Sequence, residues 1–436
     1  MSQPAPRQRK RAVKLFYCGK HFYAKNAYKE WMPISDTVAN HYLIRGGFRG
    51  FKYDGHMTVA TDHLLTIRER DCVTFAGPIA GQRAGLLCYN GVRMLVTSAP
   101  KLPIAKKGGW PLWQEILGEQ LGDKLPLVLE WHRQAYLRVF NCGGPLLPAL
   151  AVAGETGTGK SLMADILTRG LLGGRVANPV RYMMGQTTFN ANVCGSETLL
   201  LDDVPSRMQK DALDSFQGQL KSMIAAPFDS LHVKGKDALD VPVLRAVFIA
   251  MNQEPHNFRI LPLDDTDLDD KLMLLRVLRR PACLPQSSDY EAQLKLGKAL
   301  EKEIPYVLWH LLHDFKCPKD QLWHRGQACF RDPFLIAKSR EDDPVSRVLW
   351  LFDQLAAKMQ ADGTIFPARP KTATEWDRLL RDELGNEAGS VLDNGRNPLS
   401  LGHQLRSAAK RFPARVQLDK EESHGGVSKW TVKAGA

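Results

Sequence analysis

The chain has 436 residues, enough for two to four domains, and its 44% hydrophobic and 24% charged residues are ordinary for a globular protein. Its longest uncharged apolar run, residues 145–154, is too short to span a bilayer, which excludes a membrane-spanning protein. No apolar segment follows the basic start, so we expect no secretory signal. The eight cysteines form no CxxC pair, which favours reduced thiols in a cytoplasmic protein over a zinc site.

The net charge of +12 is concentrated near the start of the chain, because the first 125 residues carry 19 basic and 9 acidic side chains. Such an asymmetry indicates a polyanionic partner, with nucleic acid as the first candidate. A solvated basic face that binds nothing would have the same composition. Residues 1–14 contain the run RQRKRAVK and are predicted to form a flexible basic arm.

Residues 15–109 are predicted to form a small, basic α+β domain. Three β-prone runs, 63–70, 71–77 and 91–98, are separated by glycine, proline and asparagine. The run HFYAKNAYKEW (21–31) alternates aromatic residues with lysines, which suits stacking on bases, but the edge of a half-buried strand has the same pattern. The domain is interpreted as a DNA-binding module or as a collar for ring assembly.

Apolar patterns divide the rest of the chain into four parts. Residues 110–147 show helical spacing and are predicted to be a helical oligomerisation segment. Residues 148–285 open with a continuous apolar run and then alternate helices and strands, which predicts an α/β ATPase core with a parallel sheet flanked by helices. Residues 286–338 are predicted to be a helical extension, and residues 339–436 a separate small domain.

The strongest motif is GETGTGKS at residues 154–161, which fits the phosphate-loop pattern GxxxxGK[ST] in full. An apolar strand precedes it and a helical pattern follows, which is the setting that the motif requires. Its glycines let backbone N–H groups face phosphate oxygens, Lys160 can neutralise the β- and γ-phosphates, and the Ser161 hydroxyl can bind Mg²⁺. The alternative is a glycine-rich turn without a ligand. The predicted ATP contacts are Gly154, Glu155, Thr156, Gly157, Thr158, Gly159, Lys160 and Ser161.

Two further strands are predicted to end in polar residues at the same edge of the sheet. The apolar run Leu199–Leu201 is followed by Asp202, the predicted Mg²⁺ ligand, and Asp203, predicted to orient the attacking water. A helix cap or turn pair is the alternative for these aspartates. The run 244–252 ends in Asn252, which is expected to contact the γ-phosphate and position the water.

A lysine-tipped hairpin is predicted between the acidic pair and Asn252. Residues 230–233 and 239–243 are strand-like, and the intervening turn carries Lys234 and Lys236, with His232 just before it. Such a hairpin can grip backbone phosphates of DNA and move with the nucleotide state. An exposed hairpin whose lysines only aid solubility fits the sequence equally well.

This layout resembles superfamily 3 helicases, the AAA+-type enzymes of small DNA viruses, phages and plasmids. The resemblance is carried by GETGTGKS, FNANVCGSETLLLDDV (189–204), the lysine hairpin and VFIAMNQEP (247–255). It implies a ring, usually a homohexamer, that uses ATP and Mg²⁺ to unwind DNA in phage, plasmid or mobile-element replication, with single-stranded or forked DNA as its partner. It also implies a cytoplasmic location, a primase or another replication protein as a partner, and no membrane contact. The acidic pair is Asp-Asp, and the hairpin tip is Lys-Gly-Lys, so no tip histidine can be assigned.

The resemblance also implies a basic residue that reaches the neighbouring subunit's γ-phosphate. The segment after Asn252 offers Lys271 and Arg276 as candidates, with Arg279 and Arg280 behind them. The alternative is that these side chains cap a helix or pair with the nearby aspartates.

The C-terminal domain is predicted to resemble a winged helix, with a capping box at Thr372 and Glu375 starting an earlier helix. A later helix is expected to bury one face and to present His403, Arg406 and Lys410 on the other, with Arg406 and Lys410 contacting an origin duplex or other DNA. A domain that only packs against the ring is the alternative. The expected apolar face is Leu401, Leu405, Ala408 and Phe412.

Three functions remain open from the sequence alone. The first is a ring-forming, Mg-ATP-dependent DNA helicase. The second is a replication initiator that uses ATP to assemble on an origin without processive unwinding. The third is an NTPase switch in phage–host conflict that acts through a partner protein.

Overall fold

The structure is a computed structural model, and contact density divides it into two compact units. One unit comprises residues 1–253 and 260–332, and the other comprises residues 254–259 and 333–436. The predicted arm before residue 13 and Asp203 lie outside the described residues. The structure describes residues 13–48, 50, 52–53, 57–141, 147–202, 204–205, 208–226, 228–242, 244–263, 270–286, 288–322, 326–340, 344–392, 401–419 and 428–433.

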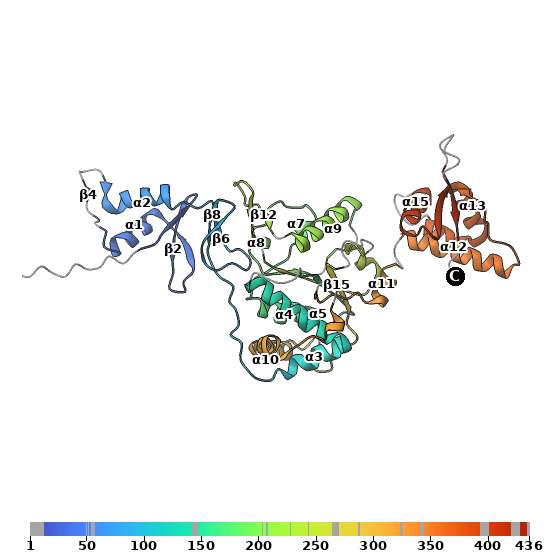
Figure 1. The fold of residues 1–436 in the computed structure, drawn as a ribbon, viewed down its shortest axis with the longest axis horizontal. Coiled ribbons are helices and arrows are strands. Elements are labelled where there is room, and N and C mark those ends of the chain that lie inside the picture. The colour runs from blue at the N-terminus through green and yellow to red at the C-terminus, as the bar shows by residue number, and fades with distance from the viewer. Residues whose placement is uncertain are drawn as a thin grey trace, which may run out of the picture. The chain divides into compact units, whose positions relative to one another are not determined.

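The first unit begins with an N-terminal module, residues 13–99, that contains two small sheets. In the first sheet, antiparallel strands follow the order β1-β2-β3, and two helices cover one face through Leu43, Leu64 and Ile67 (Figure 1). In the second sheet, β8 lies between β6, which is parallel to it, and β7, which is antiparallel. The elements are β1 (Phe16–Cys18), β2 (His21–Lys25), β3 (Trp31–Ile34), α1 (Asp36–Arg45), β4 (Lys52–Tyr53), β5 (Met57–Thr58), α2 (Val59–Arg70), β6 (Phe75–Gly77), β7 (Gly85–Tyr89) and β8 (Val92–Val96).

One strand prediction in this module is wrong, because residues 63–70 belong to helix α2. The Thr58 side chain caps the helix by accepting a hydrogen bond from Thr61 N. Buried Ala60, Leu64 and Ile67 follow the helical spacing of four and three residues. The cap and this spacing outweigh the β-branched residues that suggested a strand. The runs at 71–77 and 91–98 do contain strands, β6 and β8.

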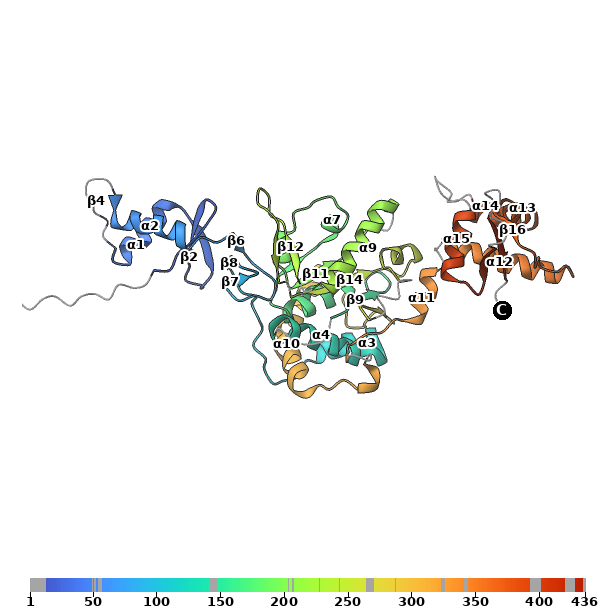
Figure 2. The same ribbon diagram turned by 45° about the horizontal axis from the view of Figure 1, so that its top comes forward.

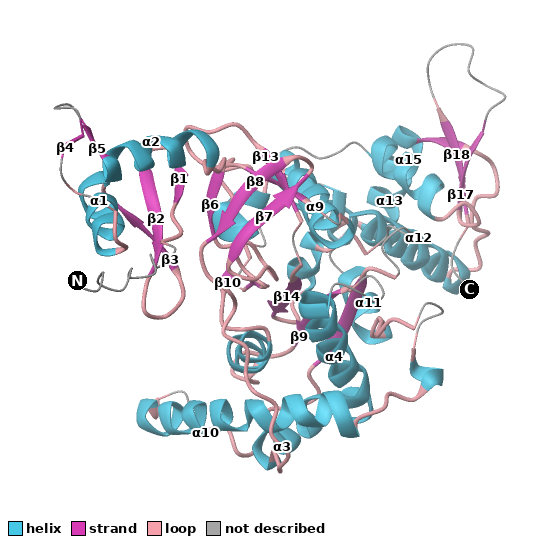
Figure 3. Ribbon diagram, turned by 60° about the vertical axis from the view of Figure 1, so that its left-hand side comes forward, coloured by secondary structure: helices cyan, strands magenta, loops and turns pink. Residues whose placement is uncertain are grey.

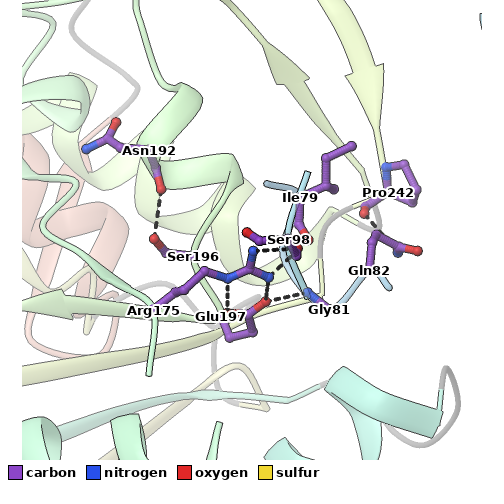
Figure 4. A network of polar contacts seen from close by, with 9 residues as sticks. All are labelled: Ile79, Gly81, Gln82, Ser98, Arg175, Asn192, Ser196, Glu197 and Pro242. Carbon is purple, nitrogen blue, oxygen red and sulfur yellow. Dashed lines mark hydrogen bonds and ion pairs between the residues drawn. The ribbon is translucent and has the colours of Figure 1, made fainter. Parts of the chain in front are cut away.

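The second sheet is attached to the following core by a buried ion pair (Figure 4). Arg175 Nε donates to Glu197 Oε2 over 2.9 Å, and the Glu197 side chain is fully buried. Arg175 also donates to the carbonyl of Ser98 over 3.2 Å, and Gly81 N donates to Glu197 Oε1 over 2.8 Å. The pair therefore ties the backbone before β7 and after β8 to the edge of the core.

The core is a five-stranded parallel sheet of order β10-β11-β14-β9-β15, which confirms the predicted α/β fold class. All residues of β9, β11 and β14 are buried, as expected for strands covered on both faces. Because the strands are parallel, their carboxyl ends share one edge. The strands are β9 (Ala149–Ala153), β10 (Val176–Ala177), β11 (Thr198–Leu201), β14 (Ala246–Met251) and β15 (Leu272–Arg276), and an antiparallel hairpin of β12 (Asp229–Leu231) and β13 (Leu239–Val241) precedes β14.

Helices cover both faces of this sheet. On one face, α3, α4 and α10 bury Trp113, Trp131 and Leu300 against the strands, while α7 and α9 lie on the other face (Figures 1 and 2). The helical elements are α3 (Pro111–Leu121), η1 (Gly122–Lys124), α4 (Leu125–Asn141), α5 (Lys160–Leu162), the π-helical η2 (Met163–Thr168), α6 (Arg169–Leu171), α7 (Val180–Met183), α8 (Ala191–Cys194), α9 (Lys210–Ala225), η3 (Pro255–Ile260), α10 (Tyr290–Trp309), the π-helical η5 (His310–Asp314) and η6 (Lys319–Gln321).

The second unit packs helices against an antiparallel sheet of order β16-β18-β17. The predicted capping box is present, because Glu375 N donates to Thr372 Oγ1 and Thr372 N donates to Glu375 Oε2. Trp376 lies in the core and donates to the Trp430 carbonyl over 3.1 Å. The elements are α11 (Pro333–Arg340), α12 (Pro344–Ala361), β16 (Lys371–Thr372), α13 (Ala373–Leu384), α14 (Asn386–Leu392), α15 (Leu401–Arg411), β17 (Val416–Asp419) and β18 (Lys429–Val432). Among the described residues of both units, no helix has the length and apolar character needed to span a membrane.

Candidate nucleotide-binding site

The phosphate loop, residues 154–161, connects β9 to α5 at the carboxyl edge of the sheet. Gly157 and Gly159 have φ angles of 79° and 85°, in the left-handed region that glycine adopts readily. A Cβ on Gly159 would lie 2.9 Å from Gln120 Nε2 and 3.0 Å from Leu284 Cδ1. The loop therefore needs glycine at this position both for its backbone conformation and for the space around it.

Lys160 points back into the loop that precedes it. Its side chain is buried, and Nζ donates to the carbonyls of Gly154 over 2.9 Å and Glu155 over 2.8 Å. It also donates to Asn252 Oδ1 over 3.3 Å. Thr158 is buried and its hydroxyl donates to the Glu155 carbonyl over 2.7 Å. The ammonium is thus held at the centre of the loop, whereas Glu155, Thr156 and Gly157 are exposed at its tip.

The Ser161 hydroxyl meets the acidic residue that follows β11. Ser161 Oγ donates to Asp202 Oδ2 over 3.1 Å, although 41 residues separate them in the chain. A hydroxyl oxygen and a carboxylate oxygen side by side are hard ligands of the kind that Mg²⁺ binds. Asp203, the predicted water-orienting residue, lies outside the described residues.

The parallel register explains why these side chains meet. Leu201 pairs with Ile249, and Met251 pairs with Ala153, so Asp202, Asn252 and the phosphate loop all follow the ends of neighbouring strands. The structure brings together Lys160, Ser161, Asp202 and Asn252, four residues that the sequence had placed in three separate motifs.

A cavity of about 400 Å³ extends from the loop toward the start of α10. One side is polar and comprises the loop, Ser161 and Asp165. The other side is mainly apolar, with Leu284, Pro285 and Leu296. Such a combination suits a ligand that has both a charged and an aromatic part. The remaining lining residues are Leu162, Ile166, Arg280 and Gln293.

Two residues at this site have roles that the sequence does not predict. Gln120 of α3 donates to the Thr158 carbonyl over 2.6 Å and supports the loop from outside the motif. Arg280 lines the cavity and donates to the carbonyls of Leu284 and Pro285. No local pattern marks Gln120, because it approaches only through the tertiary fold. For Arg280 the sequence predicts a role at a neighbouring subunit, a helix cap or a pairing with aspartates, but not a place in the cavity of its own chain.

Asp165 could have been found from its spacing, because it lies four residues after Ser161 on the same helical face. Burial raises the pKa of its carboxyl, and the negative charge of Asp202 raises it further, while Arg169 acts in the opposite direction. The carboxyl groups of Asp165 and Asp202 are therefore close enough to interact, and both contribute to a negative electrostatic potential beside the Ser161 hydroxyl.

The two candidates for a residue acting on a neighbouring subunit lie at opposite ends of β15. Lys271 precedes the strand, and its carbonyl accepts a hydrogen bond from Ala149 N. Arg276 ends the strand opposite Ala153, at the nucleotide edge, and lies 3.7 Å from Asp332 Oδ2. Lys271 therefore lies at the amino ends of the strands, and Arg276 lies at their carboxyl ends, beside the phosphate loop.

The predicted hairpin forms, but its surroundings differ from those of a free hairpin. Leu231 and Val241 pack against Phe75 and Met94 of the N-terminal module, and Figure 3 shows β13 beside β7 and β8. Lys236 Nζ donates to the Thr74 carbonyl over 3.0 Å and contacts Cys18 Sγ at 3.2 Å, whereas Lys234 is exposed. His232 follows β12 at the start of the turn, and its ring centroid lies 5.3 Å from that of Phe189.

In the second unit, α15 divides its faces as the sequence predicts. Leu401, Leu405 and Ala408 are buried, and Arg406 and Lys410 are exposed together with His403. The exposed basic side chains follow each other at a spacing of about one helical turn.

The donors and acceptors at the phosphate loop fit a nucleoside triphosphate with Mg²⁺. The crowded Gly159 backbone, the Lys160 ammonium and the helix that starts at the loop favour an anion. Ser161 and Asp202 supply a hydroxyl and a carboxylate for the metal ion.

Comparison with known proteins gives a family match for part of the chain. Residues 152–276 match a family of unknown function, DUF5906. This segment contains the phosphate loop, Asp202, Asn252 and all of β15. No curated protein matches the chain.

Solved structures show that the fold occurs elsewhere over nearly the same length. The apo structure of the NrS-1 C-terminal region has a TM-score of 0.56 at 11% identity, covering 97% of this chain and 96% of that chain. JCV helicase bound to a small acetamide compound has a TM-score of 0.31 at 13% identity, covering 59% of this chain and 66% of that chain. The SCCmec type IV Cch helicase has a TM-score of 0.30 at 12% identity, covering 89% and 72%. At these identities a match reflects the fold alone, and the two lower scores do not define a common fold.

Proposed function

We propose that the chain is a Mg²⁺-dependent ATP hydrolase that unwinds DNA as a ring, in the manner of superfamily 3 helicases. The observation that carries the proposal is the meeting of Lys160, Ser161, Asp202 and Asn252 at one edge of a parallel sheet. P-loop enzymes use these residue types for phosphate, metal and water. The order of the motifs and the AAA+-like arrangement of sheet and helices support the same conclusion.

Each residue has a distinct role in this proposal. The N–H groups of the loop donate to phosphate oxygens, and Lys160 exchanges its carbonyl partners for the β- and γ-phosphates. Ser161 and Asp202 would hold Mg²⁺, which would supply positive charge to neutralise the phosphoryl oxygens. Asn252 and Asp203 orient the water that attacks the γ-phosphate.

The proposed ring is a homohexamer with ATP between neighbouring subunits. A residue that serves the next subunit has to lie away from its own nucleotide site. Lys271, at the far end of β15, meets this condition better than Arg276, which ends the strand beside its own phosphate loop.

Single-stranded or forked DNA is the proposed substrate, in phage, plasmid or mobile-element replication in the cytoplasm. Lys234, Lys236 and His232 are proposed to contact one strand. In the second unit, α15 is followed by the β17–β18 hairpin, an order typical of a winged helix, and Arg406 and Lys410 are proposed to contact duplex DNA. A primase or another replication protein is the expected partner.

The rate of ATP hydrolysis by the variant Lys160→Ala tests whether the phosphate loop is the catalytic site. We expect turnover to fall by at least about 10²-fold, because a preorganised charge that stabilises the transition state is lost. Lys295→Ala is the matched control, because Lys295 is exposed on α10 and does not line the cavity. Turnover equal to that of the unchanged chain would show that the phosphate loop is not the catalytic site.

Strand displacement from a forked duplex tests the motor. The unchanged chain should release the labelled strand when ATP is supplied, and the double variant Lys234→Ala/Lys236→Ala should retain basal hydrolysis but release little strand. Hydrolysis without any strand release by the unchanged chain would reject the helicase proposal.

A replication initiator is the second candidate, and the anchored hairpin favours it. Lys236 is bonded to the N-terminal module, which suits a hairpin with a fixed position rather than one that moves in each ATP cycle. An initiator would protect origin DNA from nuclease in the presence of a non-hydrolysable ATP analogue and would not displace a strand.

A further inference from the structure

A cavity of about 320 Å³ opens between the two sheets of the N-terminal module, far along the chain from the phosphate loop. Lys14, Phe16, Lys25 and Trp31 line it from the first sheet. Gly85 and Leu86 of β7 line it from the second sheet. A space of this size admits one nucleotide unit but not a duplex. None of the six lining residues is acidic.

Two lysines lie at the same end of the first sheet. Phe16 pairs with Tyr23 at the end of the β1–β2 ladder, Lys14 lies two residues before Phe16, and Lys25 lies two residues after Tyr23. Lys25 in turn pairs with Trp31 across β2 and β3. Like charges that line one cavity repel each other. The arrangement therefore favours an anion that binds both ammonium groups.

Aromatic rings hold both ammonium groups in place. Lys14 Nζ lies 5.2 Å from the ring centroid of Phe16, and Lys25 Nζ lies 5.2 Å from that of Trp31. The two rings pack edge to face with centroids 5.1 Å apart and are almost fully buried. Because the rings are fixed, the lysines lose less conformational freedom on binding than ordinary surface lysines do.

Apolar surface lines the rest of the cavity. The Trp31 ring lines one wall and is almost fully buried. Leu86 on the opposite wall is 41% exposed and offers an apolar surface at the rim. Two cations and an apolar wall are complementary to a phosphate that is joined to a sugar and base.

We propose that this cavity, which we call the lysine-pair pocket (Lys14, Phe16, Lys25, Trp31, Gly85 and Leu86), binds one nucleotide of a single-stranded nucleic acid through its phosphate. The inference rests on the proposed function only in its choice of DNA as the strand. The excess of basic residues in this part of the chain favours a strand over a free mononucleotide, because a strand's neighbouring phosphates can contact exposed lysines around the pocket.

The test is the affinity of the full chain for fluorescent oligo(dT), measured by anisotropy over a series of salt concentrations. For Lys14→Gln/Lys25→Gln we expect affinity to fall about tenfold and the slope of log affinity against log salt to become shallower by about 0.7, the contribution of one phosphate contact to a single strand. The control Lys20→Gln/Lys29→Gln removes the same charge from exposed residues outside the pocket and should cause a smaller loss.

A second pair of variants keeps both lysines. Leu86→Glu places a carboxylate on the pocket wall and should weaken oligo(dT) binding about as much as the double variant. Leu65→Glu, on α2, makes the same charge change at a leucine that is 40% exposed and should have little effect. Equal losses for the pocket variants and their controls would overturn the proposal.

The affinity for thymidine monophosphate, measured by calorimetry, distinguishes a free nucleotide from a nucleic-acid strand as the source of the phosphate. If Lys14→Gln/Lys25→Gln loses the mononucleotide but retains oligo(dT), the pocket is a free-nucleotide site and the strand proposal is wrong. ATP hydrolysis without DNA should be unchanged in all four variants. Failure of the unchanged chain to hydrolyse ATP would reject the proposed function and leave the oligo(dT) comparison intact.

Discussion

The phosphate loop and the lysine hairpin are both short segments that contain lysine. The hydrogen-bond partners of their lysines, however, lie at very different distances along the chain. Lys160 finds two of its acceptors five and six residues away, in its own loop. Lys236 finds its acceptors 162 and 218 residues away, in the N-terminal module. A local motif can therefore encode the first geometry, whereas the second depends on how two distant segments pack.

The difference shows that a motif does not determine the freedom of the segment that contains it. The hairpin has the composition of a mobile, DNA-gripping element. Its apolar residues Leu231 and Val241 are nevertheless covered by the β6–β8–β7 sheet, which the Arg175–Glu197 pair ties to the core. Three perturbations compare these two regions, from the largest expected effect to the smallest.

Arg175→Met should have the largest effect on stability. It leaves the Glu197 carboxylate buried without its cation, which costs about 3–5 kcal/mol of the free energy of unfolding. Urea unfolding of the first unit gives this value, and hydrogen exchange should show faster opening of β12 and β13 than of β9. Arg181→Met, at an exposed arginine of α7, is the control.

A double variant checks the cause of that loss. Arg175→Met/Glu197→Gln removes the unpaired charge while the amide can still accept from Gly81 N, so it should recover part of the stability. A loss below about 1 kcal/mol in the single variant would mean that the pair does not anchor the module.

Acid should weaken the region of the phosphate loop through His132 of α4. Its ring contacts Thr168 Oγ1 at 3.0 Å and the Val128 carbonyl at 2.8 Å, and burial lowers its pKa from 6.5 to about 4. The unfolded chain takes up a proton below pH 6.5, but the folded chain does so only near pH 4. Stability is therefore complete above pH 6.5 and falls by about 3 kcal/mol as the pH drops to 4.

The measurement is the urea midpoint of the first unit at several pH values. His132→Gln should remove this part of the pH dependence, whereas His403→Gln, at an exposed position of α15, should leave it in place. An unchanged acid profile in His132→Gln would contradict the assignment.

Lys236→Gln should have the smallest effect on stability, below about 1 kcal/mol, because its ammonium is only partly buried and the hairpin is held mainly by apolar packing. Anisotropy with oligo(dT) should show a weaker effect for Lys236→Gln than for Lys234→Gln, whose ammonium is exposed. The opposite order would mean that Lys236 leaves the N-terminal module when DNA binds.

By itself, the sequence determined the features that depend on neighbouring residues. The buried strands, the left-handed glycines of the phosphate loop, the Thr372–Glu375 capping box and the buried face of α15 follow from side-chain size, periodicity and backbone freedom over a few residues. The parallel sheet also follows, because strands covered on both faces have continuous apolar sequences. The meeting of Ser161 with Asp202 required in addition that β9 and β11 lie on either side of β14.

Only the tertiary structure decided which distant surfaces meet. Gln120 supports the phosphate loop, Arg280 lines the nucleotide cavity and Lys236 binds the N-terminal module, yet none of them belongs to a pattern that predicts its partner. Residues 63–70 became a helix because a cap and a buried apolar face outweighed local β preference. For the first three, the physical reason is that packing and hydrogen bonding between segments far apart in the chain exceed the weak preferences that any one segment carries. For residues 63–70, the burial of one helix face adds to the local cap.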